Sequence, residues 1–164
     1  MGVIMSNHID SQRIQALLDR EEIRALRQHY SNLLDGNNAE RMGEVFTEDA
    51  EVVVTVGSMQ GLPAIKHSLA EAYQEFDSQQ RGHFPFVHAI TNHMITLTGN
   101  NSATGSCYLL DFVTDRPSAQ HPFLLVGRYL DEYQRVNGEW RIAKTILDVI
   151  WPHAESDVKT NKDR

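Results

Sequence analysis

The sequence has one cysteine, no long apolar run and no internal repeat. The single cysteine, Cys107, excludes an internal disulfide bond and favours a reducing compartment. No segment approaches the roughly 18–20 consecutive apolar residues that a membrane-spanning helix needs, and the N-terminus lacks the cationic start and apolar run of a secretory signal. We therefore expect a cytoplasmic protein with no membrane partner.

Basic residues are also scarce. The chain has 15 Lys and Arg against 22 Asp and Glu, which gives a formal net charge of −7. The positive side chains are scattered rather than gathered in a stripe, so the overall field repels nucleic acid. We expect no nucleic-acid partner.

Motifs that hold metals or nucleotides are missing as well. The sequence has no Glu-x-x-His, no His-x-His and no pair of cysteines. A spacing of five places His88 on the opposite strand face from His83 and His93. The chain also has no glycine-rich phosphate loop and no Gly-x-Ser-x-Gly turn. We therefore expect no metal site and no cofactor.

The length and the hydrophobic content of the chain are sufficient for one globular domain. The 164 residues fall within the roughly 100–200 residues of a typical domain, and 41% of them are hydrophobic, which supports a real core. The polar ends have no periodicity, so we expect flexible tails at 1–9 and 153–164 around a single domain at 10–152.

The first half of the chain has mainly helical patterns. In the longest of them apolar residues recur at helical spacing, Arg and Glu fill the other face, and a break near Asp19–Arg20 is left open. The expected elements are helices at 10–34, 39–46 and 61–76, a turn at 47–49 and a strand at 51–56.

The second half has the character of a sheet. The expected strands are 86–97, 103–113, 123–135 and 139–151. Asn137-Gly138, between the last two, is the strongest short hairpin signal. Helices followed by an antiparallel meander indicate an α+β fold. A strongly bent sheet over the long helix leaves a concave face, where we expect a ligand.

A set of local signatures accompanies this order of elements. They are Ile23–Tyr30 leading to Asp35, Phe46–Ala50, Gly61, His88 with Asn92, Ala103–Gly105, Tyr129 and Gly138–Ile142. Over residues 10–151 the set resembles the SnoaL-like, nuclear-transport-factor-2-like superfamily. The resemblance implies a cone-shaped α+β barrel, with N-terminal helices packed on a strongly curved mixed or antiparallel sheet around one deep apolar pocket. Members include dehydratases, isomerases, cyclases and plain binding proteins, so the side chains must decide the function.

Four residues resemble the pattern of the scytalone dehydratase and bile-acid 7α-dehydratase branch: Tyr30, Asp35, His88 and Asp111. By that match His88 is the base and Asp35 its partner, while Tyr30 and Asp111 hold a substrate oxygen. Elimination of water beside a carbonyl does need a base of near-neutral pKa, which histidine supplies. A carboxylate on the other ring nitrogen fixes the tautomer and favours the imidazolium. Asp111, among apolar neighbours on its strand, is expected to have a raised pKa.

Other side chains are expected to line the pocket. The period of two places residues 88, 90 and 92 on one strand face, and residues 145, 147, 149 and 151 on another. The predicted lining consists of Asn92, Thr145, Leu147, Val149, Trp151 and Phe112, with further walls from Phe84, Phe86 and Phe123. Such a floor suits a small hydrophobic ligand, polycyclic or terpenoid.

We expect a cofactor-independent lyase or isomerase, of dehydratase type, that acts on a hydrophobic cyclic hydroxy-carbonyl compound and forms a homodimer or homotrimer. The alternative is a non-catalytic ligand-binding or oligomerisation module, such as a dioxygenase β subunit. Structural explanations also exist, since Asp35 fits a helix cap, Tyr30 an amphipathic core and Asp111 a strand end that faces water. More than about 5 Å between Asp35 and His88 would favour the alternative.

Overall fold

The computed structural model describes residues 2–55, 57–77, 79–82 and 84–152. The elements in chain order are α1 (Gly2–Asp35), the 3-10 helix η1 (Ala39–Glu44), β1 (Phe46–Val54), β2 (Gly57–Gln60), α2 (Leu62–Phe76), β3 (Phe86–Leu97), β4 (Ser102–Val113), β5 (Phe123–Val136) and β6 (Glu139–Trp151). The tail expected at 153–164 lies outside the described residues.

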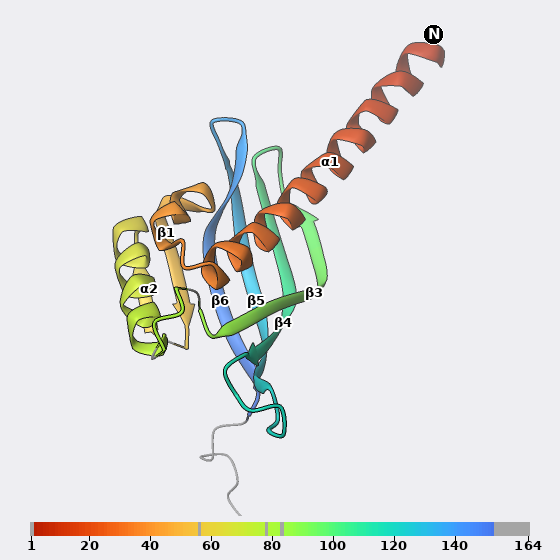
Figure 1. The fold of residues 1–164 in the computed structure, drawn as a ribbon. Coiled ribbons are helices and arrows are strands. Elements are labelled where there is room, and N and C mark those ends of the chain that lie inside the picture. Colours follow the sequence, from red (N-terminus) through yellow and green to blue (C-terminus); the bar gives the residue numbers. More distant parts are fainter. Residues whose placement is uncertain (1, 56, 78, 83, 153–164) are drawn as a thin grey trace, which may run out of the picture.

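One continuous helix, α1, opens the chain, and its N-terminal part projects beyond the sheet (Figure 1). Residues 2–9, expected as a tail, therefore belong to the helix. The break left open near Asp19–Arg20 is also absent, because no Gly or Pro interrupts residues 3–35 and two contacts support that turn. Gln15 donates a hydrogen bond to Asp19 at 2.9 Å, and Arg20 donates one to the carbonyl of Ala16 at 3.0 Å.

The segment between α1 and α2 differs from expectation in two ways. The second helix is a 3-10 helix that ends at Glu44, and the turn expected at 47–49 is part of β1. A strand forms here instead of a turn because it buries Phe46 and Val52 and pairs in parallel with β6. The short β2, which was not expected, then pairs antiparallel with β1. The helix expected at 61–76 is confirmed as α2.

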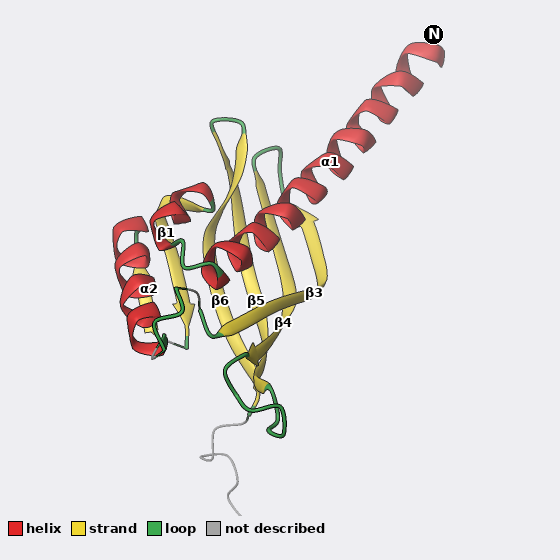
Figure 2. Ribbon diagram, viewed as in Figure 1, coloured by secondary structure: helices red, strands yellow, loops and turns green. Residues whose placement is uncertain are grey.

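Six strands form one open sheet in the order β2-β1-β6-β5-β4-β3, and the run from β3 to β6 is the antiparallel meander that the sequence predicts (Figure 2). The sheet does not close, because β2 and β3 stay at its two edges. α1 lies across one face and contacts β3 and β6, whereas α2 packs beside η1 and β1. The α+β class and the cone-like arrangement are confirmed.

A bulge interrupts β3 and changes which residues face the core. The pairing with β4 shifts between Thr91 and Met94, and Asn92 adopts a positive φ of 53°. One extra residue reverses the alternation of side chains. His93 therefore lies on the same sheet face as His88, which corrects the expectation that the two face opposite sides, while Asn92 is exposed.

Candidate active site

Asp35 and His88 meet although 53 residues separate them in the chain. Asp35 is the last residue of α1, and His88 lies near the start of β3. The Nδ1–H of His88 donates to Asp35 Oδ1 at 2.5 Å, and the backbone N–H of His88 donates to Oδ2 at 3.2 Å. A further hydrogen bond holds the end of α1, because the backbone N–H of Phe84 donates to the carbonyl of Asp35 at 3.1 Å. Because Nδ1 is engaged by the carboxylate, Nε2 is the nitrogen left to act as a base.

Asp111 faces the other side of the same imidazole. The antiparallel register pairs His88 with Asp111 across β3 and β4, so both side chains lie on one face. Asp111 Oδ2 lies 3.8 Å from His88 Nε2, and Oδ1 is buried with no hydrogen-bond partner among the described residues. Burial raises the pKa of Asp111 to about 6, against the attraction of His88 and with the repulsion of Asp35. The raised pKa expected from the sequence is therefore present.

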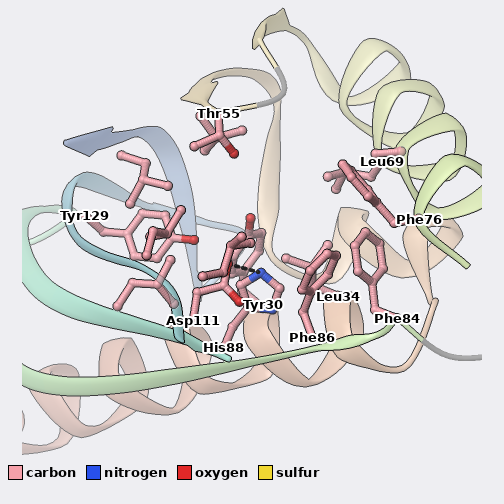
Figure 3. A pocket seen from close by; sticks show the side chains of 16 residues that line it. Tyr30, Leu34, Thr55, Leu69, Phe76, Phe84, Phe86, His88, Asp111 and Tyr129 are labelled. Atoms are coloured by element: carbon pink, nitrogen blue, oxygen red, sulfur yellow. Dashed lines mark ion pairs between the residues drawn. The ribbon is translucent and has the colours of Figure 1, made fainter. Parts of the chain in front are cut away.

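A cavity of about 240 Å³ opens beside this histidine. Its polar groups include the side chains of Tyr30, His88, Asp111 and Tyr129, and most of the remaining lining is apolar. The other lining residues are Leu34, Val54, Thr55, Leu69, Ala72, Phe76, Phe84, Phe86, Leu109, Leu124, Leu125 and Leu147. Figure 3 shows Tyr129, Asp111 and His88 on one side of the pocket and Leu69, Phe76 and Phe84 on the other. The pocket is thus polar at one end and aromatic and aliphatic at the other.

Several residues predicted to line the pocket lie elsewhere. Leu147, Phe84 and Phe86 do line it, but Asn92, Thr145, Val149, Trp151, Phe112 and Phe123 do not. Thr145 is fully buried and donates a hydrogen bond to Asp131 at 2.5 Å.

Irregular strand pairing explains the remaining differences. The bulge in β3 turns Asn92 outward. Shifts in register after Asp111 and after Val126 distort the strand ends, where Phe112 stacks on Phe123 at 4.6 Å between ring centres and Trp151 is 44% exposed. A regular alternation, which the sequence prediction assumed, does not continue through such shifts.

The structure also adds residues that sequence reasoning missed. Val54 ends β1 and Thr55 follows it, whereas Leu69, Ala72 and Phe76 come from α2. The spacing of the α2 residues was a usable signal, because positions 69, 72 and 76 fall on one helix face. Tyr129 is the most consequential addition, since it brings a second buried phenol to the polar end.

A second buried polar cluster lies behind the pocket. Asp131 accepts hydrogen bonds from Tyr133 at 2.6 Å and from Thr145 at 2.5 Å, and its Oδ2 lies 3.6 Å from Nε of the fully buried Arg27. Ligand-type atoms of Asp131, His93 and Cys107 lie within 4.8 Å of one another.

This cluster is poorly suited to a metal ion. Burial raises the pKa of the Cys107 thiol to about 11, so near pH 7 Cys107 is the protonated thiol and not the thiolate that binds a metal ion. The guanidinium of Arg27 already supplies the positive charge beside Asp131. A second cation there would be repelled, and we assign no metal to it.

Taken together, the open mixed sheet, the long helix across it and the half-polar pocket define a cone-shaped α+β domain with a cavity inside. The sequence matches the model of the SnoaL-like domain over residues 15–146. The chain belongs to this family.

Solved structures agree on the fold. A candidate scytalone dehydratase from Novosphingobium aromaticivorans is 26% identical, with a TM-score of 0.68 over 85% of this chain and 91% of that one. LinA is 20% identical, with a TM-score of 0.69 over 87% of this chain and 95% of LinA. An NTF2-like protein with a cystatin-like fold, also from N. aromaticivorans, is 23% identical with a TM-score of 0.71, over 88% of this chain and 90% of that one. No curated protein matches, and no helix in the described part of the chain could span a membrane.

Proposed function

We propose that this protein is a cofactor-independent lyase or isomerase that removes a carbon-bound proton from a hydrophobic cyclic hydroxy-carbonyl compound. The observation that carries the proposal is the 2.5 Å contact between His88 Nδ1 and Asp35 beside an apolar cavity. A binding module has no need of an imidazole fixed in this way, so the contact favours catalysis over the alternative of a ligand-binding or oligomerisation module. The similarity to a candidate scytalone dehydratase points in the same direction.

The reaction begins at the free nitrogen of His88. Nε2 takes a proton from the carbon next to the substrate carbonyl, and the C–H electron pair forms a carbon–carbon double bond to the carbonyl carbon. The carbonyl oxygen becomes enolate-like, while Asp35 stabilises the imidazolium. A positioned base of this kind contributes about 10²–10⁴-fold to the rate.

The polar end of the pocket offers donors for that oxygen. Tyr30 and Tyr129 carry hydroxyl groups, and in its protonated form Asp111 is a third donor. One such donor is worth about 10²–10³-fold. The enolate then expels the hydroxyl group from the neighbouring carbon. The departing hydroxyl group takes the proton from His88 and leaves as water. Return of the proton to a different carbon would give isomerisation instead.

The lining also bears on the charge of the substrate. It contains Asp111, with Asp35 directly behind His88, and the described lining residues include no Lys or Arg. A substrate that carries a permanent carboxylate or phosphate would therefore meet carboxyl groups and no Lys or Arg among the described lining residues. The proposal is accordingly for an uncharged substrate.

Proton abstraction can be tested without knowing the natural substrate. Cyclic ketones of one to three rings are incubated with the protein in deuterated buffer, and deuterium at the carbon next to the carbonyl is followed by NMR. His88→Ala and Asp35→Asn should each slow the exchange by about 10²-fold or more while the proteins stay folded. Asp148→Asn, which changes a half-exposed carboxylate on β6, is the control. Exchange at the parent rate in His88→Ala would refute the proposal.

A further inference from the structure

A positively charged side chain lies directly behind the two phenols of the pocket. Arg27, on α1, is 0% exposed. Its guanidinium carbon lies 3.5 Å from the ring centre of Tyr129 and 4.6 Å from that of Tyr30. The two rings meet edge to face with their centres 6.2 Å apart, and both line the cavity. The charge therefore lies against two aromatic rings that line the pocket.

Arg27 is not held there by a full set of polar contacts. Among the described residues its one ion pair is with Asp131, at 3.6 Å, and Asp131 already accepts hydrogen bonds from Tyr133 and Thr145. None of the three guanidinium nitrogens makes a hydrogen bond of ordinary geometry with a described residue. An apolar side chain of similar volume would serve packing better at this position, because buried charge is costly unless it is well paired.

The positive charge of Arg27 offsets the negative potential of the pocket. Asp35 disfavours a negative oxygen in the site, and so does Asp111 when it is ionised. Burial raises the pKa of Tyr129 well above its usual value and that of Tyr30 above its own, so both hydroxyls stay protonated, and the two side chains form a hydrogen bond with each other. In Figure 3 the hydroxyl of Tyr129 points toward the interior of the pocket. A cation on the faces of these rings draws electron density from them, which strengthens both hydroxyls as donors.

We propose that Arg27 is a positioning residue that turns the Tyr30–Tyr129 pair into a binding site for an oxyanion, the enolate of a ketone or a phenolate of similar shape. The identity of the reacting oxygen rests on the proposed function. The binding of an anionic oxygen does not, because it can be measured without turnover.

The test uses naphthols as probes, since the neutral and ionised forms absorb differently from each other and from the aromatic residues of the protein. The ionised fraction of bound naphthol is measured for the parent, Arg27→Met, Arg27→Lys and Asp131→Asn. Arg27→Met should lower the ratio of ionised to neutral bound probe by about ten- to fiftyfold, as expected for loss of a charge in a partly shielded interior. Arg27→Lys keeps the charge and should recover part of that ratio.

Asp131→Asn separates this role from a structural one. It removes the negative partner and leaves the charge of Arg27 less neutralised, so the ionised fraction should rise above that of the parent. If Arg27 served only to hold the fold, both substitutions would lower binding together. Asp131→Asn also keeps the proposal testable if Arg27→Met does not fold.

The outcomes are distinct from those of the proposed function. An unchanged ionised fraction in Arg27→Met, or a fall in Asp131→Asn, would overturn the role of Arg27 and leave the His88–Asp35 proposal intact. A parent protein that binds naphthol only in its neutral form, or not at all, would also overturn it. Failure of the proposed function would appear instead as ketone exchange that does not depend on His88.

Discussion

The replacement of Asp111 by Asn gives the sharpest physical prediction, because the pKa of Asp111 links stability to pH. Burial raises this pKa from an ordinary 3.8 to about 6. The folded protein therefore keeps a proton on Asp111 at pH values where the unfolded chain has lost it. The contribution of Asp111 is most favourable below about pH 4 and is lost as the pH rises to about 6.

The size of the effect follows from the difference between the two pKa values. About two pH units at about 1.4 kcal/mol each correspond to about 3 kcal/mol of stability lost between pH 4 and pH 7. Asparagine has nearly the same shape and does not ionise. Compared with the parent, Asp111→Asn should therefore gain about 3 kcal/mol in free energy of unfolding over this range, on top of any pH-independent offset from the amide.

Urea unfolding at pH 4, 5, 6, 7 and 8 measures the difference between the parent and Asp111→Asn. Subtraction removes the titration of every other group that the substitution leaves alone. Asp148→Asn, at a carboxylate whose side chain is 51% exposed, should show a nearly constant difference across the same range. A constant difference for Asp111→Asn as well would refute the argument that burial controls this carboxyl.

The remaining predictions concern the pocket and the anchoring of α1. Leu69→Trp should fill the aliphatic end of the pocket and weaken naphthol binding about tenfold or more by fluorescence titration, whereas Leu17→Trp, at a 66% exposed position, should leave it unchanged. Asp19→Ala should lower the free energy of unfolding, measured by urea denaturation, by about 2 kcal/mol. The substitution leaves Arg135 without its partner in a largely buried ion pair. An Asp19→Ala protein as stable as its parent would show that this pair contributes nothing.

The sequence was informative wherever a signal was local or belonged to a known pattern. Helical spacing located α1 and α2, and strand composition with Asn137-Gly138 located the four long strands. The pairing of Asp35 with His88 could not come from spacing, because it joins a helix end to a strand start across 53 residues. It came from the resemblance to a family, and the structure brings the two side chains into contact.

The misplaced pocket residues share a physical cause. Periodicity assumes an unbroken strand, and a single extra residue at Asn92 moves every later side chain of β3 to the other face. No residue type in that stretch marks the position of the bulge, since Asn tolerates a positive φ in many turns. Homodimer or homotrimer formation stays a prediction.

Arg27 was missed for a different reason, which is its charge. The helical pattern predicts that the Arg and Glu side chains of the first helix face solvent, yet Arg27 lies four residues after Ile23 and three before Tyr30, both of which are buried. Residues at these spacings share one helix face. An arginine on an apolar stripe is costly in a core, so its position was a signal in itself, and only the assumption that charge means solvent concealed it.

One helix, α1, carries most of the proposed chemistry. Arg27, Tyr30 and Leu34 follow one another at helical spacing, and Asp35 ends the helix. One rigid element therefore positions a cation, a phenol, a pocket wall and the carboxylate that holds His88. Rotating the helix by one residue would displace all four together. The two bonds from β3 and the residues before it to the end of α1 oppose that rotation, because the His88 N–H and the Phe84 N–H both reach Asp35. The register of the helix end against β3 is therefore the feature on which the base, the oxyanion site and the shape of the pocket all depend.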